Sequence, residues 1–285
     1  METFTLNNGI KMPCVGIGTA GLPKDAIERV LGTAYDCGYR MIDTAWHYFN
    51  EEEIGQALKN LKIRREDLFI TSKLHFDDLF KVENNTPIPQ KNIKEAYEDT
   101  LRRLKIDYLD LFLVHWPWFN FKFMYEGICE LFEMGVRAVG VSSFEPHHLE
   151  ALLNNNEIKK VVVPAVNQFE MSPFGQRKYL TEFCRNHNIQ CEAFSQFAVP
   201  AGSNSSVLLE NESLMNIANS HNKSTSQVVL RWLYQEKVVC IPRSKTESRI
   251  RENIDIFDFR LSEEEMNIIR SLDMDQYTRP RKLQK

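Results

Sequence analysis

The 285-residue sequence lacks the features of membrane, secreted and nucleic-acid-binding proteins. It has no apolar run near the roughly 20 residues that a membrane-spanning helix needs. Its opening residues, METFTLNNG, do not form the charged and then apolar leader of a secretory precursor. With 35 basic against 39 acidic residues, the net charge of −4 gives no electrostatic reason to bind nucleic acid or an anionic membrane. We therefore expect a cytoplasmic protein without nucleic-acid or membrane partners.

The sequence also lacks paired cysteines. Its six cysteines are scattered and form no CxxC motif. Most lie in apolar segments, where a reduced thiol packs as a small apolar side chain. Since 43% of the residues are hydrophobic and 26% are charged, the chain has a globular composition and can form a core without disulfides.

Eight apolar runs of strand length alternate with segments of helical periodicity. The runs cover residues 14–19, 39–44, 68–74, 108–116, 138–143, 162–168, 190–195 and 238–242. Between them, stretches such as 24–38, 92–105 and 224–235 carry apolar residues at helical spacing. No linker rich in proline, glycine or serine divides the series. The pattern predicts an α/β fold, a (β/α)8 TIM barrel formed as one domain by residues 1–285.

Other segments add detail to this prediction. Asn8-Gly9 favours a tight turn, so we expect an N-terminal β-hairpin that closes the bottom of the barrel. Residues 76–90 and 196–205 are expected to be long loops. A doubly wound sheet is the alternative fold, but the lone glycine cluster GIGTAG (residues 16–21) is only weak evidence for that class.

Polar residues that end the apolar runs indicate chemistry, because barrel active sites lie at the carboxyl ends of the strands. Asp43, Lys73 and His115 end three runs, and Tyr48 lies in the segment after Asp43. A neighbouring ammonium lowers the pKa of a tyrosine, and an aspartate can hold that ammonium in place. Such a group suits a carbonyl oxygen that gains a proton while its carbon gains a hydride, and the hydride must come from a cofactor.

The motifs around these residues resemble those of the aldo-keto reductases from about residue 4 to 273. Three regions carry the resemblance: G-Y-R-x-x-D-T-A-x-x-Y-x-N-E from residue 38, VRAVGVSSF (136–144) and IPRSKTESRIRENI (241–254). TSKL, LVHWP and PAVNQ agree as well. The resemblance implies reduction of aldehydes or ketones by NADPH on a (β/α)8 barrel, without a metal. It also implies that Tyr48 is the proton donor, Lys73 lowers the pKa of Tyr48, Asp43 anchors Lys73, and His115 orients the carbonyl.

The resemblance also implies binding residues. For the cofactor these are Gly18, Thr19, Asp43, Ser142, Ser143, Gln168, Phe194, Ser195, Phe197, Arg243, Ser244, Arg249, Glu252 and Asn253. For the substrate they are Ala20, His47, His75, His115 and Trp116. Ser142, Ser143 and Gln168 would hold the nicotinamide carboxamide, Phe194 would stack on the ring, and residues 243–253 would bind the adenosine end. We expect a monomer with a small-molecule carbonyl substrate whose identity the sequence leaves open.

The sequence departs from the family at Ser143, which stands where the family has asparagine.

Two other functions are considered. His47, His75 and His115 could bind zinc in a barrel hydrolase, although Asp43 has a lysine to pair with. The chain could also be a regulatory protein that keeps the fold without turnover, but the complete Asp-Lys-Tyr-His set argues against this.

Overall fold

A computed structural model describes residues 1–83, 86–154, 162–198 and 206–276. Eight strands form one parallel sheet in chain order. They are β3 (Ile17–Gly18), β4 (Met41–Asp43), β5 (Phe69–Leu74), β8 (Leu111–Val114), β9 (Ala138–Ser142), β10 (Val166–Glu170), β11 (Gln190–Phe194) and β12 (Val239–Cys240). A parallel bridge between Val15 and Cys240 joins the first and last strands, and the backbone N–H of Gly16 donates to the Cys240 carbonyl at 2.9 Å. These contacts close the sheet and confirm the predicted (β/α)8 barrel.

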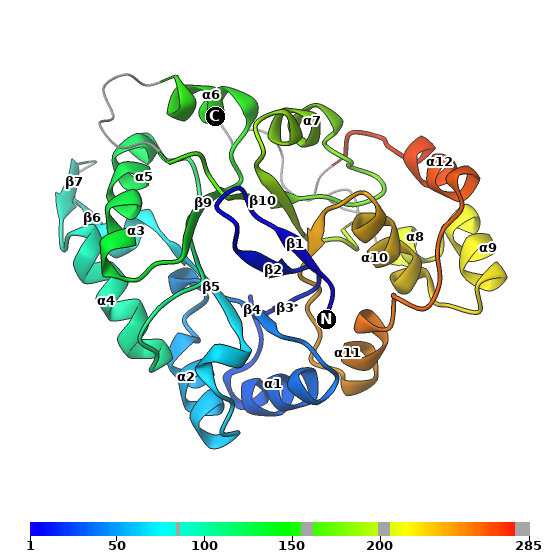
Figure 1. The fold of residues 1–285 in the computed structure, drawn as a ribbon, viewed down its shortest axis with the longest axis horizontal. Coiled ribbons are helices and arrows are strands. Elements are labelled where there is room, and N and C mark those ends of the chain that lie inside the picture. The colour runs from blue at the N-terminus through cyan, green and yellow to red at the C-terminus, as the bar shows by residue number, and fades with distance from the viewer. Residues whose placement is uncertain (84–85, 155–161, 199–205, 277–285) are drawn as a thin grey trace.

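Helices follow the strands and surround the barrel (Figure 1). The longer ones are α1 (Ile27–Asp36), α2 (Glu51–Asn60), α4 (Ile93–Leu104), α5 (Phe121–Glu130), α6 (Pro146–Leu153), α7 (Lys178–Asn186), α9 (Glu212–Ser220), α10 (Thr225–Gln235), α11 (Glu247–Ile254) and α12 (Glu263–Ser271). Shorter ones are α8 (Ser206–Leu209) and the 3₁₀ turns η1 (Lys24–Ala26), η2 (Trp46–Tyr48), η3 (Arg65–Asp67) and η4 (Leu131–Met134). Capping boxes at Asn92, Ser224 and Ser262 satisfy backbone N–H groups and set the starts of α4, α10 and α12.

The N-terminal hairpin lies across one end of the barrel, as predicted. Strand β1 (Thr3–Thr5) pairs antiparallel with β2 (Lys11–Pro13), and Gly9 in the turn has a φ of 85°, which glycine adopts without strain. Leu6 and Met12 bury their side chains against the first residues of several barrel strands, including Met41 and Phe69. The hairpin therefore closes the amino-terminal end of the barrel, which leaves the carboxyl end for the site.

Two predictions about local structure are corrected. Residues 76–90 are not an unstructured loop: they contain α3 (Phe76–Leu79) and the hairpin β6 (Phe80–Glu83) and β7 (Thr86–Pro89). The run predicted as a strand over 162–168 begins only at Val166, because Pro164 has no N–H to donate to a sheet. Of the predicted loop over 196–205, residues 199–205 lie outside the described residues.

Two further observations concern the whole described chain. All six cysteines are free, as the sequence predicted: Cys37 is half-buried, and the other five are buried. Within the described ranges, no helix combines the length and apolar character that crossing a membrane requires.

Candidate active site

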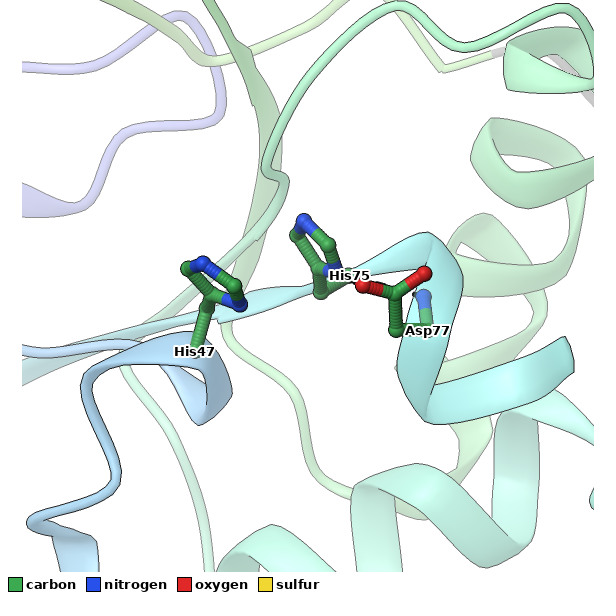
Figure 2. A group of neighbouring side chains, drawn as sticks. All are labelled: His47, His75 and Asp77. Carbon is green, nitrogen blue, oxygen red and sulfur yellow. Dashed lines mark hydrogen bonds and ion pairs between the residues drawn. The ribbon is translucent and has the colours of Figure 1, made fainter. Parts of the chain in front are cut away.

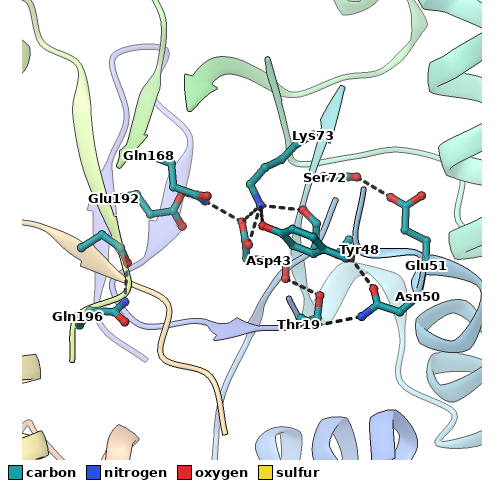
Figure 3. A network of polar contacts seen from close by, with 12 residues as sticks. Thr19, Asp43, Tyr48, Asn50, Glu51, Ser72, Lys73, Gln168, Glu192 and Gln196 are labelled. Carbon is teal, nitrogen blue, oxygen red and sulfur yellow. Dashed lines mark hydrogen bonds and ion pairs between the residues drawn. The ribbon is translucent and has the colours of Figure 1, made fainter. Parts of the chain in front are cut away.

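A buried lysine connects the aspartate and the tyrosine that the sequence singled out. Asp43 ends β4 and Lys73 lies near the end of the neighbouring β5, while Tyr48 ends η2. The Lys73 Nζ donates to both carboxylate oxygens of Asp43 at 2.7 and 2.8 Å, to the Thr44 carbonyl at 2.9 Å, and to the Tyr48 hydroxyl at 3.2 Å (Figure 3). The ammonium is thereby held between a carboxylate and a phenol.

Burial and neighbouring charges have opposite effects on the pKa values of Lys73 and Tyr48. Burial disfavours the ammonium of Lys73, but Asp43 and Tyr48 outweigh it and hold the pKa of Lys73 above its usual value. Burial also raises the pKa of the Tyr48 phenol, and the Lys73 charge only partly opposes that rise. Lys73 thus acts to lower the pKa of Tyr48, in the direction expected from the sequence, but burial has the larger effect, which the sequence could not show. Tyr48 stays protonated at neutral pH, as a proton donor must be.

Polar residues behind Asp43, Lys73 and Tyr48 hold these three side chains in place, a role that was not predicted from the sequence. The Asn50 side chain precedes α2 but donates to the Thr19 carbonyl at 2.9 Å instead of capping the helix. The Thr19 hydroxyl donates to the Asp43 carbonyl at 2.9 Å. Glu51 accepts from the Ser72 hydroxyl at 2.6 Å and from Arg103 at 2.8 Å. These contacts explain the Asn-Glu pair that ends the first motif.

A second carboxylate, Glu192, lies beside the group and was not predicted. The Gln168 side chain donates through Nε2 to Asp43 Oδ2 and to Glu192 Oε2, each at 2.8 Å (Figure 3). Glu192 is fully buried in β11, and its Oε1 has no hydrogen-bond partner among the described residues. Burial, with a contribution from the Asp43 charge, raises the pKa of Glu192 to about 8.

A cavity of about 630 Å³ opens over these residues at the carboxyl end of the barrel. It runs from Tyr48 to Arg243 and brings together most of the predicted contacts. The predicted residues that line it are Gly18, Ala20, Asp43, His47, Tyr48, His115, Trp116, Ser142, Gln168, Phe194, Ser195, Phe197 and Arg243. Thr19 and Ser143 are buried next to the lining.

The residues predicted for the adenosine end lie around the start of α11. Arg243 and Arg249 are exposed, and Ser244 Oγ accepts from the Thr246 backbone N–H at 3.0 Å. Glu252 accepts from the Ser224 hydroxyl, and Asn253 is buried. Arg243 lines the cavity and its Nη1 donates to the Ala20 carbonyl, whereas the exposed Arg249 lies on α11.

His75 packs behind the lining of the cavity against His47 and Trp116. Its Nδ1 accepts from the Asp77 backbone N–H at 3.1 Å, which caps α3. Burial, reinforced by the neighbouring His47, lowers the pKa of His75 to about 4. His75 is therefore a neutral imidazole that supports the wall of the cavity.

His47, His75 and Asp77 are near enough to one another to raise the question of a metal site (Figure 2). Their ligand atoms all lie within 4.8 Å of one another, but His75 Nδ1 already accepts a hydrogen bond from the Asp77 backbone N–H. The two imidazole rings stack with centroids 4.4 Å apart and planes 17° apart. Because imidazole lone pairs lie in the ring plane, stacked rings do not aim two of them at one ion. The described cluster is thus not arranged to hold a metal.

Comparison with known proteins agrees with this geometry. The family model "Aldo/keto reductase family" matches residues 14–274. A glyoxal reductase of Bacillus subtilis is 42% identical over 283 residues, covering 98% of this chain and 95% of the relative. A methylglyoxal reductase of Escherichia coli is 36% identical over 272 residues, covering 94% of this chain and 92% of the relative.

A solved structure supports the same assignment. An aldo-keto reductase from a Medee basin deep-sea metagenome library superposes with a TM-score of 0.85 at 37% identity, covering 96% of each chain. Family match, relatives and structure agree along nearly the whole chain, so the protein belongs to the aldo/keto reductase family of carbonyl-reducing enzymes.

Proposed function

We propose that the protein reduces small aldehydes and ketones with NADPH and that Tyr48 donates the proton. The observation that supports this best is the contact of the Lys73 ammonium with both Asp43 and the Tyr48 hydroxyl at the floor of the cavity. A buried ammonium held by a carboxylate stabilises the phenolate that Tyr48 becomes after it gives up its proton.

The lining of the cavity fits a nicotinamide dinucleotide. Phe194 offers an aromatic face, and Ser142 and Gln168 offer polar atoms at the same end. Arg243 also lines the cavity, and the exposed Arg249 lies in the first turn of α11; their guanidinium groups suit a phosphate. When bound there, the reduced cofactor would supply the hydride.

In the proposed reaction, the substrate carbonyl lies beside Tyr48 and His115, whose rings are 5.7 Å apart and nearly perpendicular. His115 donates a hydrogen bond that orients the carbonyl oxygen. As the carbonyl carbon accepts the hydride, its oxygen takes the proton of the Tyr48 hydroxyl and the product is an alcohol. Solvent then returns a proton to Tyr48.

We propose 2-oxoaldehydes such as glyoxal and methylglyoxal as substrates. The two relatives described above are named for these compounds. His47 and Trp116 also line the cavity, and their ring N–H groups can bind a second carbonyl oxygen.

The test is the loss of NADPH absorbance with a panel of aldehydes and ketones that includes both 2-oxoaldehydes. General acid catalysis contributes roughly 10²–10⁴-fold, so Tyr48→Phe should lower kcat by that factor while the NADPH dissociation constant stays within about twofold. Tyr179→Phe, at an exposed tyrosine of α7, is the matched control and should behave as wild type. Turnover by Tyr48→Phe at the wild-type rate would refute the assignment. A chelator should leave the wild-type rate unchanged.

A further inference from the structure

We propose that Glu192 is a positioning residue that fixes the side-chain amide of Gln168, so that the Gln168 carbonyl oxygen faces the nicotinamide carboxamide. This inference rests on the proposed NADPH-dependent function, but it concerns a contact that the function itself does not require. Glu192 does not line the described cavity and touches the cofactor site only through Gln168.

A glutamine side chain has two N–H donors on nitrogen and one acceptor oxygen. Gln168 Nε2 makes one 2.8 Å bond to Asp43 and another to Glu192, so both N–H groups are used. The carbonyl oxygen is the polar atom that remains, and Gln168 lines the cavity.

The two carboxylates allow one orientation of this amide. If Gln168 turned its oxygen toward them, that oxygen would lie about 2.8 Å from the Asp43 carboxylate with no proton between them, whichever protonation state Glu192 has. Without Glu192, Asp43 would accept one N–H of Gln168 and the second N–H would have no partner. An unsatisfied N–H in a buried position is costly, so the amide would be free to rotate toward another partner. Asp43 is also shared with Lys73, whereas Gln168 is the described partner of Glu192. Glu192 therefore provides the second, independent restraint.

The protonation state of Glu192 does not change this role. Burial raises the pKa of Glu192 to about 8, so the neutral form is present at neutral pH. A neutral carboxyl group keeps a carbonyl oxygen that accepts from Gln168, and a carboxylate accepts with either oxygen. Among the described residues, Asp43, Lys73, Tyr48 and Cys240 are titratable groups that interact electrostatically with Glu192.

The fixed oxygen would accept from the carboxamide NH₂, so the experiment compares two cofactors that differ only there. NADPH carries the amide, and its reduced 3-acetylpyridine analogue carries a methyl ketone without the N–H. Both rings are uncharged in the reduced form, so loss of the Glu192 charge acts equally on both. Binding of each is measured by fluorescence titration without substrate.

Wild type should bind NADPH about 2–10-fold more tightly than the analogue, as expected for one neutral hydrogen bond. Glu192→Leu removes the acceptor and should bring this ratio close to one. Glu192→Gln keeps an acceptor oxygen without the charge and should retain most of the preference. A general structural role would weaken both cofactors together and leave the ratio unchanged.

The possible results distinguish failure of the Glu192 role, of the Gln168 contact and of the proposed function. A wild-type ratio in Glu192→Leu overturns the positioning role, and equal binding of both cofactors by wild type shows that Gln168 does not contact the carboxamide. If wild type binds neither cofactor, the proposed function fails and this inference fails with it. Glu192→Thr, which also lacks a well-placed carboxyl, is measured in the same way if the leucine variant does not fold.

Discussion

At the scale of single residues, the site is stabilised by a buried ion pair between Lys73 and Asp43. Lys73 is fully buried, and its ion pair with Asp43 is 2.7 Å long. Removing one partner of such a pair leaves an uncompensated buried charge and costs about 3–5 kcal/mol. Variants of Asp43 or Lys73 therefore combine loss of stability with loss of function, and residues at the edge of the site are better probes.

Ser143 is one such probe. It has a φ of 62°, in the left-handed region that asparagine adopts more readily than serine. Its backbone N–H donates to the backbone carbonyl of Gln168 at 2.7 Å, so this conformation lies beside the predicted carboxamide site. Ser143→Asn should suit the backbone, reach further and tighten NADPH by a few-fold, up to about tenfold.

Titration of wild type and Ser143→Asn with NADPH and NADH measures this effect. The NADPH/NADH ratio should stay constant, because both cofactors carry the carboxamide. Unchanged or weaker NADPH binding would show that the buried pocket has closed around serine and that a larger side chain clashes.

A second prediction concerns Arg249, at the predicted adenosine end of the cofactor site. We propose that it binds the 2′-phosphate through charge-assisted hydrogen bonds, each contributing about 1.5–3 kcal/mol. Arg249→Ala should therefore weaken NADPH by roughly tenfold or more and leave NADH nearly unchanged. Arg251→Ala is the matched control, because Arg251 lies on the same helix but pairs with Glu247 at 2.7 Å. Equal weakening of NADPH and NADH by Arg249→Ala would contradict the phosphate role.

Among the elements, the β6–β7 hairpin is the one expected to affect substrate choice. Phe80 at its start stacks on Phe76 with ring centroids 5.0 Å apart. Phe76 contacts Trp118, and Trp118 contacts His75 behind the cavity wall. The hairpin is thus connected to the substrate end of the cavity through aromatic side chains.

Replacing residues 81–88 by a short turn should change the relative KM values of small and bulky carbonyl substrates. The NADPH dissociation constant should not change, because the residues predicted to bind NADPH lie on other elements. An unchanged substrate ranking would show that the hairpin is a surface addition without a role in substrate choice.

For the whole molecule, the closed barrel implies that distant parts of the chain unfold together. We propose that residues 1–285 form one domain, so calorimetry should show a single transition. At free NADPH of about 100 times its dissociation constant, binding stabilises the folded state by about 2.7 kcal/mol and should raise Tm by roughly 5 °C. NADH at the same concentration should raise Tm less. Two transitions would contradict the single domain, and equal shifts would contradict the preference for NADPH.

The sequence alone was sufficient for the barrel and for the four catalytic candidates. Strand runs and helical periodicity are local patterns, and a polar residue that ends an apolar run is visible without a structure. Asp43, Lys73 and His115 each end such a run, and the carboxyl ends of parallel strands meet at one face. Tyr48 was found because its motif resembles that of a known family.

The tertiary structure was needed for whatever depends on burial or on distant partners. Gln168 bonds to Asp43 across 125 positions of the chain and to Glu192 across 24, and an isolated glutamate in an apolar strand carries no local signal of this contact. The pKa of Tyr48 depends on whether burial or the Lys73 charge has the larger effect, and burial is a property of the folded chain. Sequence patterns therefore located the candidate reacting groups, whereas their protonation and orientation depend on packing that forms only when the barrel closes.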